Sequence, residues 1–408
     1  MTTKSILCTL VMAGLGTAGE PAAAAVHNLR AASTSITMAD GSQVPMWGFG
    51  LTSDSAVSIP GPALAVPPGD DTLIINLTNE LSVPISIVIP GIPAPLTPVW
   101  NDGTSGARTN LMQRAVSFTH VAQPGATVTY QWTSIQPGTY LYHSGTHPAV
   151  QVPMGLYGAV RHDAAPGQVY GVAYDRDQVL VYSEVDPTLN GAVTGGTYGT
   201  PGYPSTIAYR PRYSLINGQE TNNPLELQQG VNERLLLRVV NAGLRSIVPT
   251  LASGSMTLLA EDGHAAPFAR ASYSMLLPAG KTRDALLVLT EPGSTVLLDR
   301  RGASRLARFN ALPNVPPVAA DDLAVTLRNT AKVIHVVAND SDSDGTITSV
   351  TVTSQPSSGG TATSLGNGTV RYRPKHNFKG VDKFTYVVHD NQGAVSAPAK
   401  VRVFVVKL

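Results

Sequence analysis

The chain has 408 residues, of which 43% are hydrophobic and 13% are charged, and its formal net charge is +1. At roughly 100–200 residues per domain, this length predicts two to four domains. Lysine and arginine are spread along the chain, which argues against a nucleic-acid partner. The 38 glycines and 31 prolines interrupt runs rich in valine, threonine, isoleucine, leucine and tyrosine. This pattern predicts an all-β fold with many turns.

Residues 1–25 have the composition of a secretory signal peptide. Lys4 precedes an apolar segment over residues 6–15, and the small residues at 22–25 suit cleavage by a signal peptidase. Cleavage there would remove Cys8, the only cysteine, so the mature protein would contain neither a disulfide nor a thiolate ligand. No later segment offers about 18 consecutive apolar residues. We therefore expect a secreted protein, periplasmic, extracellular or on the cell surface, with no transmembrane span.

Three blocks follow the signal segment, at residues 26–165, 166–312 and 313–408. The first two alternate strand-like runs with Pro/Gly turns, and a Pro-rich joint, "LPNVPPVAADD", separates them from the third. Strand-like runs are expected at residues 72–79, 127–135, 138–143, 213–219, 233–243, 255–264 and 285–289. Their spacing is typical of β-sandwiches or barrels.

Motifs in the first two blocks occur in the order found in one family. "GDDTLIINLTN" and "QPGATVTYQWTSIQPGTYLYHSG" resemble the first cupredoxin domain of multicopper oxidases, and "YSLINGQ", "LRVVNAGLRS" and "LLAEDGHAAPF" resemble the second. The resemblance covers most of residues 55–300 and implies two Greek-key cupredoxin β-sandwiches. The third block, with "VVANDSDSDGTITSVTV", resembles a bacterial immunoglobulin-like or cadherin-like module. It implies a third β-sandwich and a protein or cell-surface partner for this module.

The resemblance also implies copper ligands, and this chain lacks most of them. The family holds a blue copper with two His and one Cys, and a three-copper cluster with paired His-x-His motifs. Where the family has His-Trp-His-Gly, this chain reads "SIVIPGI" over residues 86–92, which is expected to put Ile87 and Ile89 at the ligand positions. Where the family has Tyr-His-Ser-His, this chain has "YHSG" over residues 142–145. We therefore expect no full laccase cycle and assign no catalytic residue.

A simpler copper site remains open at the end of the first block. His143 and His147 are candidate ligands for a single copper ion, with His120 as a third ligand and His162 as the alternative third. Neutral imidazoles suit copper(II) in a secreted protein. The alternative is that His143 is a hydrogen-bonded residue at a strand end and His147 a surface loop residue.

The third block contains a candidate calcium site. Asp340, Asp342 and Asp344 alternate before Gly345, as in the opening half of a calcium loop. Thr351 and Thr353 lie where the closing acidic residue is needed. The alternative is a solvated turn, because aspartate often caps its own turn.

The sequence leaves several interpretations open. The first is a secreted multicopper-oxidase-like protein without the full laccase cycle that binds a single copper ion. The alternative is a non-catalytic structural or adhesive surface protein built from β-sandwich modules. A third is an oxidase that completes its site with ligands from a partner chain. The sequence does not determine the oligomeric state or the substrate.

Overall fold

The computed structural model describes residues 24–93, 97–302 and 304–407. Within these ranges nearly all of the regular secondary structure is β-strand, which confirms the predicted all-β class. Three hydrophobic cores lie between packed sheets, one in each of three sandwiches. The predicted signal segment lies outside the described residues except at its end, where Ala25 begins the first strand. No helix in the described ranges is long and apolar enough to cross a membrane.

The first sandwich contains two main sheets. The larger consists, in spatial order, of β2 (Gln43–Leu51), β1 (Ala25–Thr37), β4 (Leu73–Asn79) and β7 (Thr127–Trp132). The smaller consists of β3 (Leu64–Val66), β9 (Tyr157–His162) and β8 (Gly138–His143). The strand pair β5 (Val99–Trp100) and β6 (Ala115–Ser117) and the short helix α1 (Pro148–Gln151) complete it.

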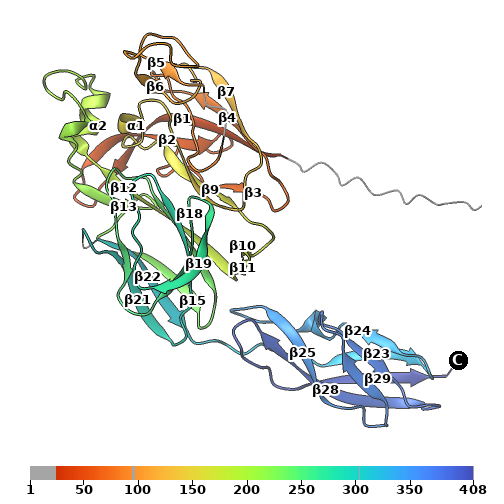
Figure 1. Cartoon of the computed structure of the whole chain (residues 1–408). Coiled ribbons are helices and arrows are strands. Elements are labelled where there is room, and N and C mark those ends of the chain that lie inside the picture. Colours follow the sequence, from red (N-terminus) through yellow and green to blue (C-terminus); the bar gives the residue numbers. More distant parts are fainter. Residues whose placement is uncertain (1–23, 94–96, 303, 408) are drawn as a thin grey trace, which may run out of the picture.

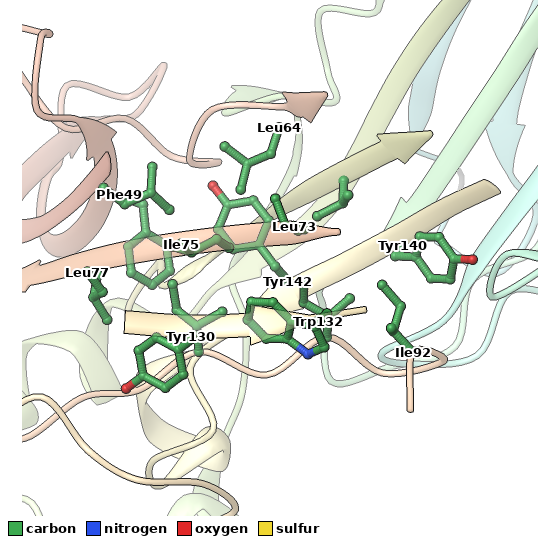
Figure 2. Close-up of a cluster of buried hydrophobic side chains, with 14 of the residues drawn as sticks. Phe49, Leu64, Leu73, Ile75, Leu77, Ile92, Tyr130, Trp132, Tyr140 and Tyr142 are labelled. Carbon is green, nitrogen blue, oxygen red and sulfur yellow. The ribbon is translucent and has the colours of Figure 1, made fainter. Parts of the chain in front are cut away.

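The core of the first sandwich follows from alternation along its strands. In β4, Leu73, Ile75 and Leu77 are fully buried while the residues between them are partly exposed, because successive side chains point to opposite faces of a sheet. Figure 2 shows these side chains packed with Phe49, Tyr130, Trp132 and Tyr142 from neighbouring strands. Tyr142 therefore anchors the end of β8 directly before His143.

The second sandwich has a seven-stranded sheet packed on a four-stranded sheet. The seven strands are, in order, β14 (Gln219–Glu220), β13 (Tyr213–Ile216), β12 (Arg176–Val185), β16 (Leu235–Asn241), β20 (Thr282–Leu287), β18 (Met256–Glu261) and β19 (His264–Ser272). The four are β15 (Leu225–Gly230), β22 (Arg305–Leu312), β21 (Gly293–Asp299) and β17 (Pro249–Leu251). The small pair β10 (Gln168–Val169) and β11 (Val172–Ala173) precedes them.

The helix α2 (Pro187–Thr194) leaves the second sandwich and packs against β2 of the first. Asp186 caps its start by accepting hydrogen bonds from the backbone N–H groups of Thr188 and Leu189, at 3.0 and 3.3 Å. The buried side chain of Asn190 donates to the carbonyl oxygen of Pro45 at 3.1 Å. The helix therefore ties the two sandwiches together next to α1 (Figure 1).

The third sandwich packs a four-stranded sheet on a three-stranded one. The first has the order β23 (Asp322–Leu327), β29 (Ala399–Val406), β28 (Gly380–Asp390) and β25 (Ile347–Ser354), and the second β24 (Lys332–Ile334), β27 (Val370–Arg373) and β26 (Thr361–Ser364). Figure 1 shows this sandwich at one end of the molecule, across the second sandwich from α1 and α2.

Candidate functional site

His143 ends β8 and is half-buried. Its backbone pairs with Val88 through two hydrogen bonds of 2.9 and 3.0 Å. The ring Nδ1 lies 2.8 Å from the carbonyl oxygen of Ser144, and because a carbonyl oxygen can only accept, Nδ1 carries the proton. Burial lowers the pKa of the imidazole, and the hydrogen bond to Ser144 acts in the opposite direction. His143 is thus a neutral imidazole whose Nε2 lone pair has no hydrogen-bond partner among the described residues.

The cavity next to His143 is apolar. Its volume is 380 Å³, and His143 is the only ionisable residue among the described residues that line it. The other lining residues are Val88, Ile89, Pro90, Gly91, Ile92, Pro93, Phe118 and Trp132. None of these side chains has an atom that commonly binds copper, so the described wall offers the metal a single protein ligand.

His147 lies in a different environment from His143. It precedes α1 in the left-handed backbone conformation, with φ 40° and ψ 55°, and its side chain is exposed. It lines a second cavity of 500 Å³ that does not include His143. The structure therefore does not bring the two candidate ligands together at one cavity.

His120 is held by other contacts. Its ring stacks on Tyr130 with centroids 4.5 Å apart, and its Nε2 lies 3.2 Å from the carbonyl oxygen of Thr129. Its Nδ1 lies 3.3 Å from the hydroxyl of Thr119. His162, the alternative third ligand, is buried at the end of β9. Across residues 24–93, 97–302 and 304–407, no three His, Cys, Asp or Glu side chains are grouped so that they could hold a metal ion.

The segment opposite His143 contains the two isoleucines that were expected at ligand positions. Ile87 and Ile89, expected at ligand positions, both belong to the buried core. Ile89 also lines the His143 cavity. The ligand-equivalent positions therefore stay a prediction, with Val88 and Pro90, which line the cavity outside the core cluster, as the other pair. None of these side chains can bind a metal, so the expected loss of this ligand pair is unchanged.

The position two residues after His143 has no room for a side chain. A Cβ atom built on Gly145 would lie 2.7 Å from Cγ1 of Val88 and 3.0 Å from Oγ of Ser86. Real side chains do not approach so closely, so Val88 or the backbone would have to move. The second His of the family's motif therefore does not fit the present packing.

Behind Gly145 lies a buried cluster of hydroxyl groups that sequence reasoning missed. The Thr146 Oγ1 lies 2.9 Å from Ser86 Oγ and 3.0 Å from Ser117 Oγ, and these two serine oxygens are 3.1 Å apart. All three residues are almost completely buried. Nearby, Ser144 donates to the side-chain oxygen of Gln151 at 2.6 Å. The only signal in the sequence was small polar residues inside otherwise apolar runs, which does not specify a partner.

The three aspartates of the candidate calcium loop use different partners. Asp340 accepts hydrogen bonds from the Tyr386 hydroxyl at 3.0 Å and from the Ala320 N–H at 2.7 Å. Asp342 accepts from the N–H groups of Asp344 and Gly345 at 3.2 and 3.1 Å, which makes a capped turn. The Asp344 carboxylate accepts from the Val315 N–H at 3.0 Å. The described contacts therefore do not direct the three carboxylates at a common point.

Comparison with known proteins identifies the class of two parts of the chain. Residues 31–165 match the family model described as "Multicopper oxidase", and residues 314–404 match that described as "Bacterial Ig domain". The chain thus contains a multicopper-oxidase cupredoxin domain and a C-terminal bacterial immunoglobulin-like domain, and the resemblance stated from its motifs is confirmed.

Curated relatives include oxidases and copper resistance proteins. L-ascorbate oxidase of Brassica rapa subsp. pekinensis is 34% identical over 31% of this chain and 20% of that protein. Multicopper oxidase MmcO of Mycobacterium tuberculosis is 26% identical over 51% of this chain and 42% of that protein. Copper resistance protein A of Pseudomonas syringae pv. tomato is 26% identical over 64% and 47%. This chain thus spans less than half the length of each of these relatives.

Solved structures support the fold. The blue copper oxidase from Nitrosomonas europaea is 18% identical, with a TM-score of 0.56, and the match covers 71% of this chain and 86% of that one. The copper nitrite reductase from the same organism is 21% identical, with a TM-score of 0.53, over 71% and 94%. At these identities the likeness shows a shared cupredoxin architecture alone.

Proposed function

We propose that this chain is a secreted multicopper-oxidase-like protein that does not carry out the copper-dependent oxidase cycle. The observation that carries the proposal is the contact between Val88 and Gly145 opposite His143, where a Cβ at Gly145 would lie 2.7 Å from the valine. A copper cluster would need histidines at two positions here. One is occupied by the apolar side chain of Val88 and the other by Gly145, which has no side chain.

The surrounding packing supports the same conclusion. The hydroxyl groups of Ser86, Ser117 and Thr146 hydrogen-bond to one another beside these positions. A hydroxyl cluster of this kind satisfies its own polar groups and needs no metal to do so. Histidines supplied by a partner chain would also find these positions filled by packed side chains. The packing therefore argues against an oxidase site shared with a partner chain.

A non-catalytic protein of this architecture would act through binding. The two cupredoxin sandwiches provide a rigid frame, and the immunoglobulin-like module at the end of the molecule is the part expected to meet a protein or a cell surface (Figure 1). The signal-like composition of residues 1–25 supports secretion.

A single copper ion at His143 is the second candidate function. The observation in its favour is the tautomer, because the Nδ1–H bond to the Ser144 carbonyl leaves Nε2 as the free donor atom beside a cavity. A backbone hydrogen bond of this kind commonly orients metal-binding histidines. Against it stands the absence of a second donor in the described wall of that cavity.

A copper-loading experiment distinguishes the copper-free protein from the single-copper site. The purified protein is incubated with copper(II), desalted, and analysed for copper per chain and by electron paramagnetic resonance, while oxygen uptake is followed with ascorbate. We expect copper far below one ion per chain and no oxygen uptake above that of buffer.

The matched variants are His143→Ala and His335→Ala, the latter at an exposed histidine of the third sandwich. Stoichiometric copper that is lost in His143→Ala and kept in His335→Ala would establish the single-copper site in place of the copper-free protein. Sustained oxygen uptake by the wild-type protein would overturn the proposal altogether.

A further inference from the structure

The cavity that His147 lines lies between the first sandwich and the segment that contains α2. Its volume of 500 Å³ is in the range of small-molecule sites. Trp47, Val116 and Val150 line it from the first sandwich, and Val193 and Tyr198 line it from α2 and the turn that follows. Junctions between domains are common places for ligand sites, because two surfaces supply opposite walls.

The walls of this cavity are held in place from both sides. Asp186 caps α2, and Asn190 on the same helix bonds to the backbone of β2. On the opposite wall, the backbone N–H of His147 donates to the carbonyl oxygen of Val116 at 2.9 Å. The cavity is therefore a feature of fixed elements.

The lining carries no strongly acidic or basic side chain. No Asp, Glu, Lys or Arg is among the described lining residues, most of which are valines and aromatics. Burying an unpaired charge against such a wall is costly, so the cavity favours an uncharged and largely apolar molecule.

Several polar side chains line the cavity, and some of them are already hydrogen-bonded within the protein. Ser117 and Thr146 bond within the buried hydroxyl cluster, and the Gln151 side chain bonds to Ser144 and to the Pro84 carbonyl. The His147 imidazole has no hydrogen bond to any described residue. The side chains of Trp47, Gln123 and Tyr198 also line the cavity without a hydrogen bond to a described residue. The imidazole of His147 is one of the groups that can accept a hydrogen bond from a ligand.

The backbone of His147 adds an independent observation. A left-handed conformation is uncommon for a residue other than glycine and costs free energy. His147 keeps it with φ 40°, and its carbonyl accepts the N–H groups of Val150 and Gln151 at 2.8 and 3.0 Å. The turn thus fixes an imidazole at the edge of an uncharged cavity.

We propose that this cavity binds a small, uncharged, largely apolar molecule through one N–H or O–H group directed at the His147 imidazole. The proposal does not depend on copper binding, because His147 and His143 line separate cavities. The copper measurement therefore does not test the proposed ligand site. Likewise, a failure to find ligand binding would not contradict the proposed function.

Isothermal titration calorimetry of the full chain tests it with three related probes. Indole has the required size, polarity and N–H group, 1-methylindole lacks the N–H, and indole-3-acetate adds a negative charge. We expect saturable binding of one indole per chain, about fivefold weaker binding of 1-methylindole for the lost hydrogen bond, and binding of indole-3-acetate weaker by at least about tenfold.

Two variants locate the site. Val193→Trp fills the cavity from the half-exposed face of α2 and should abolish indole binding, whereas the matched change Val395→Trp, at an exposed valine of the third sandwich, should leave it unchanged. His147→Asn keeps a residue that tolerates the left-handed conformation and should make indole and 1-methylindole bind alike. Circular dichroism checks that each variant is folded.

Several outcomes would overturn the proposal. These are no saturable heat with indole, equal binding by the wild-type and a folded Val193→Trp protein, or equal affinities of the wild-type protein for indole and indole-3-acetate. Equal affinities for indole and 1-methylindole in the wild-type protein would remove His147 from the proposed contact.

Discussion

His143 and His147 are four residues apart in the sequence, yet their side chains line different cavities. The strand β8 ends at His143, and the chain then pairs Thr146 with Ser117 in an isolated bridge. The left-handed turn at His147 follows directly. Sequence spacing predicts a shared site only where the backbone between two residues is regular, and here it changes direction twice.

Gly145 provides the sharpest prediction at this scale. Gly145→Ala should destabilise the first sandwich by about 1–3 kcal/mol, because the added methyl group overlaps Val88 in a packed core. Hydrogen–deuterium exchange of the β8 peptide measures the local free energy of opening, with Gly191→Ala as control, since a Cβ there meets no atom within 4 Å.

A double variant tests whether the overlap with Val88 causes this loss of stability. The double variant Val88→Ala with Gly145→Ala should lose less stability than the sum of the two single variants. The difference is the interaction energy, which we expect to be roughly 0.5 kcal/mol or more. Strictly additive losses would show that the strain at Gly145 does not come from Val88.

At the scale of elements, β8 and β9 of the first sandwich meet β16 and β12 of the second around one buried arginine. The Arg238 guanidinium is fully buried. It donates to Asp177 at 2.7 Å and to Thr139 at 3.1 Å, and it also pairs with Asp163. Asp284 lies in the same cluster, where burial raises its pKa and Arg238 opposes the rise. The cation thus holds carboxylates from both sandwiches.

Replacing Arg238 should have a large effect. Arg238→Met removes the buried cation beside Asp163 and Asp284 and leaves Asp177 only its half-exposed partner Arg161. It should destabilise the junction by about 3–5 kcal/mol. The control is Arg234→Met, whose pair with Asp175 is half-exposed and should matter by less than about 1 kcal/mol. Exchange protection of the β8 and β16 peptides is the measurement. Equal effects of the two changes would contradict this account.

The strand β23 carries a pH-dependent element. Burial raises the pKa of Asp322 to about 6, the negative charges of Asp340 and Asp321 add to the rise, and the Tyr386 hydroxyl opposes it. An unfolded aspartate titrates near pH 4. Between about pH 4 and 6 the folded module therefore binds more protons than the unfolded chain, and its stability falls as the pH rises.

Asp322→Asn should remove most of this decrease in stability with rising pH. Exchange protection of the β29 peptide, corrected for the intrinsic pH dependence of exchange, should decrease from about pH 4.5 to 7 in the wild-type protein and change less in the variant. The exposed Asp344→Asn serves as control. A wild-type module that gains stability over this range would contradict the assigned sign.

Sequence reasoning was most successful for single strands. The run at residues 138–143 coincides with β8, and the run at 72–79 begins one residue before β4, because alternation and flanking turns are local signals. The helix α2 was not predicted, although Asp186-Pro187 and Gly195 have the pattern of a helix start and stop.

The candidate site could be predicted only in part. The sequence alone predicted that copper-ligand histidines of the family are missing, because this requires only a comparison of motifs. The hydroxyl cluster was not, since Ser86, Ser117 and Thr146 come from three distant segments and meet only through long-range packing. The placement of Ile87 and Ile89 at the ligand-equivalent positions stays a prediction, because both belong to the buried core while Val88 and Pro90 also line the His143 cavity.

At the scale of the whole molecule, the chain joins a copper-oxidase architecture to an immunoglobulin-like module. The third sandwich contacts the second at few places, such as the bond from the Asn232 side chain to the Gln392 carbonyl at 3.4 Å. The first two sandwiches instead share a buried apolar cluster in which Leu141 and Tyr157 pack with Val181 and Val240. Two of the three bodies are thus firmly joined, and the third is attached through a smaller contact.

The buried hydroxyl cluster has a consequence for how the protein reaches its folded state. A metal site couples folding to the supply of its ion, because ligands gathered around an absent cation are unsatisfied and repel one another. Ser86, Ser117 and Thr146 satisfy one another as soon as their segments meet. The proposed copper-free function therefore predicts that the first sandwich matures at the same yield in a copper-starved environment as in a copper-rich one.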